Sequence, residues 1–133
     1  MSDSMEPAVL DAPVALASAA APTYLDHIAT QRNHQPLVVR MADVQWLESS
    51  GNYVIFHAGA DRIEVRGTLA SFEARLDPRH FVRIHRRVLV ALDAIRELQP
   101  WFGGDQILYL RDGTKLRVSR THRAHLDRAL KAR

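Results

Sequence analysis

The chain has 133 residues, no cysteine and a formal net charge of +3 at pH 7. This length suits one domain with a single core, and the lack of cysteine excludes a disulfide framework and any thiolate metal site, so we expect a cytoplasmic location. No apolar run reaches the roughly 20 residues that a membrane-spanning helix needs, so we expect no membrane partner.

The charge is unevenly distributed along the chain. Residues 1–30 contain four acids and no Lys or Arg, whereas residues 31–133 contain all eighteen basic residues and eleven acids, which gives this part a charge of +7. Such a field favours encounter with polyanions. The Ala- and Pro-rich start of the chain discourages a continuous helix. We therefore divide the chain into a mobile leader or linker at 1–23 and a folded domain at 24–133.

Short apolar or alternating runs, separated by turn residues, predict strands in the first half of the folded part. They cover residues 24–30, 37–40, 44–47, 53–57 and 62–66. Thr68 is a suitable helix N-cap, and Leu69, Phe72 and Leu76 follow it at helical spacing until Pro78. This pattern predicts a short helix after the fifth strand.

A dense basic stretch follows at residues 79–87, with four arginines, two histidines and no acid. Phe81, Val82 and Ile84 alternate with the cations, which indicates the rim of a folded structure and not a solvated tail. Guanidinium groups match phosphate oxygens and the guanine edge in a bidentate way. The stretch therefore favours a phosphate-facing surface, although an ordinary charged strand edge or turn fits its composition equally well.

The rest of the chain predicts further strands and one helix. The strands cover residues 88–92, 95–98, 106–110 and 115–118, with turns at 101–104 and 111–114. Ser119 or Thr121 can cap the final helix. Trp101 and Phe102, beside two glycines, indicate either an exposed aromatic loop for a protein partner or a cap on the core. The fold class is therefore mainly β with two small helices.

Four blocks of residues occur in order along the folded part of the chain. They are Trp46–Val54, Arg66–Leu69, Phe81–Arg86, and Leu110–Thr114 with Val118–Arg120. In order and spacing they resemble the LytTR DNA-binding domain of LytR/AlgR-type response regulators, over about residues 24–130. The resemblance implies an elongated arrangement of three small antiparallel sheets with one or two short helices, whose loops enter successive major grooves of DNA.

The resemblance also implies which residues contact bases. Carried over position by position, the base-contacting positions of the family correspond to Asn52, Tyr53, Arg86 and Arg120 in this sequence. Alternatives stay open for each of them. Asn52 can serve the turn that follows Gly51, Tyr53 can pack half-buried at the start of a strand, and both arginines can touch phosphate alone.

A second group of residues is expected to contact DNA phosphate or to position the loops. It comprises Arg83, His85 and Ser119, which the resemblance places there, and the cations Arg87, Lys115, Arg117 and Arg123. Lys115 and Arg117 share one strand face, for which a solvated face is the alternative.

Two positions depart from the family pattern. Arg87 stands where Ser is usual, and Ala91 stands where Asn is usual. The first departure adds a charge that can tighten backbone binding or alter site preference. The second removes a polar side chain that braces the motif.

The sequence contains little that points to catalysis. It has no thiol, no Gly-rich phosphate loop and no His-Glu-x-x-His helix, so we predict that the chain is not an enzyme and needs no cofactor. His122 and His125 are three residues apart, but no third ligand accompanies them, so we predict no metal site.

The sequence therefore predicts a sequence-specific transcriptional regulator that binds double-stranded DNA, as a homodimer on repeated sites. The alternative is a protein-interaction module or anti-regulator that pairs with another regulatory protein through the same fold. The alternative is motivated by residues 1–35, which are too few to form a receiver domain. An RNA or single-strand binder is a weaker third hypothesis, because aromatic residues are few.

Overall fold

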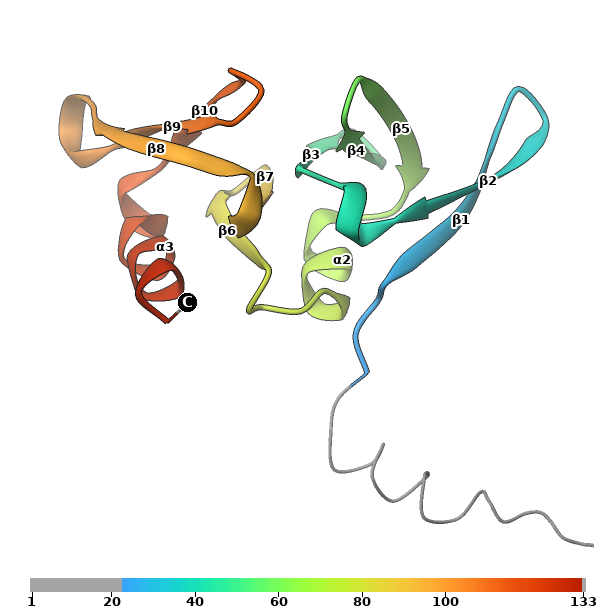
Figure 1. Cartoon of the computed structure of the whole chain (residues 1–133), viewed down its shortest axis with the longest axis horizontal. Helices are drawn as coiled ribbons and strands as arrows, with labels where there is room; N and C mark the ends of the chain where they lie inside the picture. The colour runs from blue at the N-terminus through green and yellow to red at the C-terminus, as the bar shows by residue number, and fades with distance from the viewer. Residues whose placement is uncertain (1–22, 133) are drawn as a thin grey trace, which may run out of the picture.

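The computed structural model describes residues 23–132. The leader predicted at 1–23 lies outside these residues except for Thr23, so the domain boundary stays a prediction. The described part is elongated, and its small sheets follow one another along the long axis (Figure 1). None of the helices in residues 23–132 has the length and apolar character to cross a membrane.

Ten strands and two α-helices make up the described part. The strands are β1 (His27–Arg32), β2 (Gln35–Arg40), β3 (Trp46–Ser50), β4 (Tyr53–Ala58), β5 (Asp61–Arg66), β6 (Phe81–His85), β7 (Val88–Ala91), β8 (Ile95–Pro100), β9 (Gln106–Leu110) and β10 (Lys115–Val118). The helices are α2 (Leu69–Arg75) and α3 (Arg120–Lys131), with 3-10 turns at Met41–Asp43, Leu92–Ala94 and Phe102–Gly104.

The strands form three antiparallel sheets. One contains β1 and β2, the second has the order β5-β4-β3-β7-β6, and the third has the order β10-β9-β8. This arrangement confirms the predicted fold class, which is mainly β with three small antiparallel sheets and two helices.

The first hairpin has a tighter turn than the sequence predicted. Asn33 and His34 adopt positive φ angles of 53° and 66°, which is the conformation of a two-residue hairpin turn. Strand β2 therefore begins at Gln35 and includes Pro36. Proline is tolerated because the sheet has only two strands, so each of them is an edge.

Helix α2 begins as predicted. The side chain of Thr68 accepts a hydrogen bond from the amide of Ser71 at 3.1 Å, which caps the helix. The helix ends at Arg75, because Leu76 is already extended, two residues before Pro78. Leu69, Phe72 and Leu76 are all buried.

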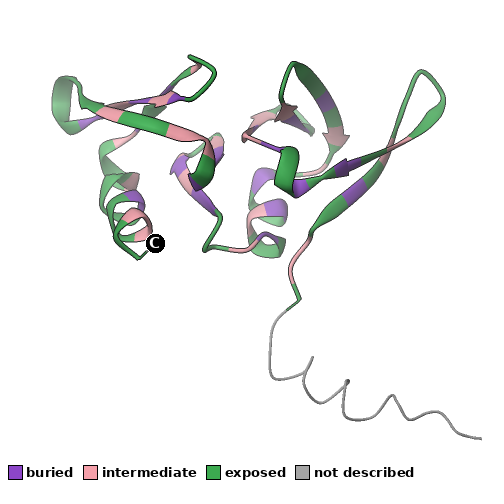
Figure 2. Cartoon of the chain, viewed as in Figure 1, coloured by how far each residue is buried: buried purple, intermediate pink, exposed green. Residues whose placement is uncertain are grey.

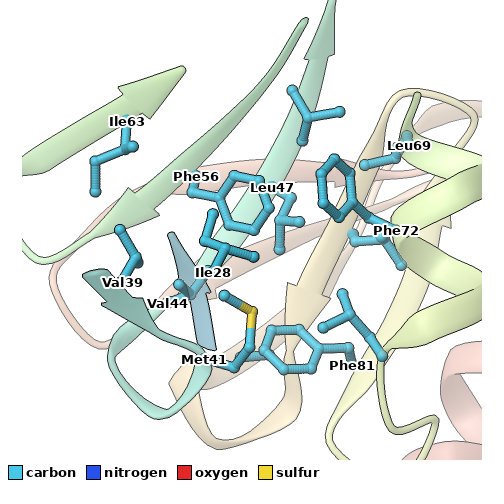
Figure 3. Packing of buried hydrophobic residues seen from close by; sticks show 14 residues of the cluster. Ile28, Val39, Met41, Val44, Leu47, Phe56, Ile63, Leu69, Phe72 and Phe81 are labelled. Atoms are coloured by element: carbon cyan, nitrogen blue, oxygen red, sulfur yellow. The ribbon is translucent and has the colours of Figure 1, made fainter. Parts of the chain in front are cut away.

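The core consists of two apolar clusters. The first lies between the β1–β2 hairpin, α2 and the five-stranded sheet, where the Phe56 and Phe72 rings meet edge to face at 5.1 Å (Figure 3). The second lies between β6–β7, the three-stranded sheet and α3, and it includes Ile84, Val118 and Leu126. The two clusters are separated by the β6–β7 pair.

Strand β7 is buried on both faces. Leu89 belongs to the first cluster and Val90 to the second, and both are no more than 1% exposed. This two-sided burial is the reason why residues 88–92 are all apolar. It also fixes the position of the turn that connects β6 to β7.

Candidate nucleic-acid interface

The turn between β6 and β7 consists of Arg86 and Arg87. The pairing of these strands shifts between Arg83 and His85, where β6 carries one extra residue in the manner of a β-bulge. Ile84, in this bulge, is fully buried, whereas Arg86 is exposed. The turn is therefore fixed to the core at its base and open to solvent at its tip.

Arg83 holds the base of this turn. Its Nε donates to the carbonyl of His85 at 3.0 Å, its Nη2 donates to the carbonyl of Arg86, and its Nη1 donates to Glu73 Oε1 at 2.5 Å. The Arg83 side chain is only 19% exposed. One guanidinium thus connects α2 to the β6–β7 turn.

The turn between β3 and β4 lies beside the β6–β7 turn. The amide of Ser49 donates to the carbonyl of Arg87 at 3.0 Å, and Arg87 Nη2 donates back to the carbonyl of Ser49 at 3.1 Å. Gly51 has a φ of 60°, which suits a tight turn, and Asn52 is exposed. The backbone carbonyl of Asn52 accepts from the amide of Gly67 at 3.0 Å.

Tyr53 lies at the start of β4, partly accessible to solvent. Its side chain is 42% exposed, and the Arg66 guanidinium lies 5.9 Å from the ring centroid. The ring is therefore accessible on the same turn as Asn52.

The start of α3 lies on the other side of the β6–β7 turn. The amide of Ser119 donates to the carbonyl of Ile84 at 2.9 Å. Ser119 is the residue before the helix, as predicted, but its hydroxyl makes no cap to a backbone amide. The hydroxyl instead lies 2.7 Å from His122 Nδ1 and 3.0 Å from the Thr121 hydroxyl.

Asp105 caps α3 in place of Ser119. Its Oδ1 accepts from the amide of Arg120 at 2.8 Å, and its Oδ2 accepts from Arg117 Nε at 2.8 Å and Nη2 at 2.5 Å. Asp105 is 8% exposed. The Arg117 guanidinium, and then the Arg120 amide, hold the pKa of this carboxyl below its ordinary value.

Asp105 was not among the residues predicted from the sequence, although the predicted hairpin contained a signal for it. Gln106 pairs with Val118 at the end of the β9–β10 ladder. Asp105 directly precedes Gln106 and Ser119 directly follows Val118, so Asp105 and Ser119 lie opposite each other just beyond this pair. An acid at that place meets the N-terminal end of the final helix, where a negative charge is favourable.

Two histidines lie in the junction between these turns. His85 Nδ1 accepts from the amide of Arg87 at 3.2 Å. Burial, followed by the charges of Arg86 and Arg117, lowers the pKa of His85. Burial also lowers the pKa of His122. Within residues 23–132, no group of three His, Cys, Asp or Glu side chains could hold a metal ion.

The two remaining predicted residues, Arg123 and Lys115, lie in different parts of the structure. Arg123 is exposed on α3, and its Nη1 donates to the carbonyl of Gly104 at 3.2 Å. Lys115 is exposed at the end of β10 away from α3, with its Nζ 5.8 Å from the centroid of the Tyr109 ring. The structure thus brings Arg123 to the α3 junction and leaves Lys115 apart from it.

A row of three connected turns results from these contacts. The Ser49–Arg87 pair links the β3–β4 turn to the β6–β7 turn, and the Ser119–Ile84 hydrogen bond links the latter to the start of α3. Within residues 23–132, the side chains of Asn52, Arg86 and Arg120 have no hydrogen-bond or ion-pair partner. These exposed polar groups are therefore available to a ligand that spans the row.

The chain resembles domains of larger regulators. It is 31% identical over 94 residues to the sensory transduction protein LytT of Bacillus subtilis (strain 168), covering 71% of this chain and 39% of that protein. It is 29% identical over 87 residues to the transcriptional regulatory protein YpdB of Escherichia coli (strain K12), covering 65% of this chain and 36% of that protein. The chain thus spans less than half of these relatives.

A solved structure has the same fold. It is the LytTr DNA-binding domain of a methyl-accepting/DNA response regulator from Bacillus cereus, with a TM-score of 0.73 and 20% sequence identity. The match covers 80% of this chain and 97% of that chain. The family model of the LytTr DNA-binding domain matches residues 34–131. The chain therefore belongs to the LytTr DNA-binding domain family.

Proposed function

We propose that this chain is a transcriptional regulator that binds double-stranded DNA and reads its sequence from the row of three turns. The observation that carries the proposal is the pair of backbone links that hold Asn52, Arg86 and Arg120 in this row. Membership of a family of DNA-binding domains supports duplex DNA as the ligand.

The arginines of the row divide into two groups by their internal contacts. Arg83, Arg87, Arg117 and Arg123 each donate to protein oxygens. Arg86 and Arg120 have no such partner in residues 23–132, so a bidentate contact to guanine would cost them no internal hydrogen bond. We therefore assign base contact to Arg86 and Arg120, and positioning or phosphate contact to the other four.

Asn52 and Tyr53 form the third part of the reading surface. Asn52 is exposed at the tip of its turn, and an amide side chain can pair with the edge of adenine. The exposed Tyr53 ring lies on the same turn and can meet a base edge or a thymine methyl group. We also propose that two chains bind a repeated site together, as a homodimer on DNA.

The test is selection of bound sites from random duplex DNA, followed by measurement of affinity for each base substitution. Arg86→Ala and Arg120→Ala should each relax preference at one base position, by about 1 to 3 kcal/mol. Arg32→Ala is the matched control, since Arg32 lies at the tip of the β1–β2 hairpin. A chain that shows no sequence preference after selection would contradict the proposal.

A further inference from the structure

Two large apolar side chains are exposed on the loop between β8 and β9. Trp101 is 52% exposed and Phe102 is 80% exposed. Their rings meet edge to face, with centroids 5.2 Å apart. Figure 2 shows the exposed loop at one end of the molecule. Contiguous exposed apolar groups are where contact surfaces are sought. This exposure also favours the aromatic loop over the core cap, the two alternatives that the sequence left open.

The loop forms a hydrogen-bonded turn. The amide of Trp101 donates to the carbonyl of Asp105 at 2.9 Å, and the amide of Asp105 donates to the carbonyl of Phe102 at 3.2 Å. Gly103 and Gly104 have φ angles of 67° and 87°, which favour glycine. The aromatic pair is therefore presented from a closed turn and not from an extended segment.

The same loop is fixed to the start of α3. Asp105 caps the amide of Arg120, and Arg123 donates to the carbonyl of Gly104. A Cβ added at Gly104 would lie 3.6 Å from the Cβ of Arg120. The loop lies next to the start of α3 in Figure 1 as well. The aromatic pair thus continues the row of turns beyond Arg120.

The surroundings of the pair are cationic. Arg117, Arg120 and Arg123 are exposed on the adjoining β10 and α3. Asp105, the one acid of the loop, is buried and paired with Arg117. On the next turn of α3, Asp127 is paired with Lys131 at 3.2 Å. Of these three cations, Arg120 alone has no side-chain partner within residues 23–132, and Arg123 donates to a backbone carbonyl only, so both keep an uncompensated positive charge. Apolar rings beside such charges match a polyanion that also has apolar faces.

We propose that Trp101 and Phe102 pack against the deoxyribose faces of the DNA strand that borders the groove read by Arg120. The inference rests on the proposed function. Deoxyribose is the apolar part of the DNA backbone, and a loop beside the reading residue meets the backbone before it meets another base. The contact therefore adds affinity at one flank of the site without adding sequence preference.

The experiment measures affinity of the full chain for two duplexes by fluorescence anisotropy. One duplex contains the selected site with long flanks on both sides. The other duplex lacks the flank on one side, so that it ends at the outermost specified base pair, and the two sides are removed in separate duplexes. The double substitution Trp101→Ala/Phe102→Ala should weaken binding to the long duplex by about tenfold. It should leave binding unchanged on the duplex that lacks the contacted flank.

Val38→Ala is the matched control, because Val38 is 62% exposed on β2, away from the row of turns. Equal affinity of the double variant and the wild type on long duplexes overturns the flank contact, while the proposed function stands. Equal weakening on all duplexes also overturns it, since the loop then acts by positioning Arg120. Failure of the wild type to prefer any duplex overturns the proposed function itself.

A second measurement follows Trp101 directly. In the variant Trp46→Phe, Trp101 is the one remaining tryptophan. Its quenching by acrylamide should fall when the long duplex binds. Unchanged quenching in the bound complex, or protection by a protein partner but not by DNA, overturns the inference.

Discussion

The backbone amide of Ser119 donates a hydrogen bond to the carbonyl of Ile84 over 2.9 Å. Ser119 directly precedes Arg120, and Ile84 lies two residues before Arg86. The backbone segments that carry two exposed arginines, from distant parts of the sequence, are therefore held side by side. Substitutions around this hydrogen bond should separate residues that position the turns from residues that contact DNA.

Arg83→Ala should weaken binding to all DNA sequences without changing the salt dependence. The donors of Arg83 are directed at Glu73, His85 and Arg86, so the side chain neutralises no phosphate in this geometry. The free energy of unfolding should also fall by about 1 to 3 kcal/mol, because two carbonyls and a carboxylate lose their donor. Affinity is measured across a salt series, and stability by urea unfolding.

Arg83→Lys distinguishes charge from geometry. Lysine keeps the positive charge but cannot donate in three directions from a rigid plane. It should therefore behave like Arg83→Ala. If the slope of log K against log salt becomes about 0.9 smaller in magnitude in Arg83→Ala but stays unchanged in Arg83→Lys, Arg83 contacts phosphate.

Asp105→Asn should destabilise the domain at neutral pH. The hydrogen bonds from Arg117 and Arg120 depress the pKa of this carboxyl, so its ionised form stabilises the folded state. That stabilisation is present above the unfolded pKa of about 3.9 and is lost as pH falls through the folded pKa. The stability difference between wild type and variant should therefore shrink towards pH 3. Urea unfolding at several pH values measures it, and a difference that is constant with pH contradicts the assignment.

Local signals were sufficient to predict most elements. Strands β9 and β10 have the predicted bounds, because each apolar alternation ends at a turn residue. Thr68 caps α2 as expected, since the cap and the apolar spacing lie within one short stretch. The family resemblance supplied the division into three sheets, which periodicity alone did not contain.

Contacts between distant residues were not predictable from the sequence. The pairing of Arg83 with Glu73 and of Asp105 with Arg120 depends on how α2 and α3 pack on the sheets. Strand β7 gave no alternation because it is buried on both faces. For the site, the sequence named the exposed residues of the row, and the structure added Asp105 and Glu73, which hold them in place.

Gly67→Ala should destabilise the domain by about 1 to 3 kcal/mol. Gly67 has a φ of 146°, and an added Cβ would lie 3.0 Å from the Phe72 ring in the first core cluster. Thermal unfolding measures the change. Gly59→Ala is the control, because Gly59 also has a positive φ but nothing lies within 4 Å of its added Cβ. An equal cost in both variants would show that the close approach to Phe72 is unimportant.

His85→Gln/His122→Gln should flatten the decline of stability in mild acid. Both imidazoles have a lowered pKa in the folded state, mainly because of burial. The unfolded chain therefore binds more protons as pH falls below about 6.5, and the wild-type domain loses stability from there towards the folded pKa values. Urea unfolding between about pH 7 and pH 5 measures the slope. The exposed His125→Gln is the control, and an unchanged slope in the double variant contradicts this account.

Arg87→Ser restores the residue that the family usually has at this position and tests what the added charge does. The Ser49 amide and His85 Nδ1 contact the backbone of Arg87, so the row of turns should persist and stability should change by about 1 kcal/mol or less. If Arg87 neutralises one phosphate, the slope of log K against log salt falls by about 0.9 and all sequences bind more weakly. Base preferences, measured on the selected site and its substitutions, should stay the same. A change of preference at one base would instead make Arg87 a reading residue beside Arg86.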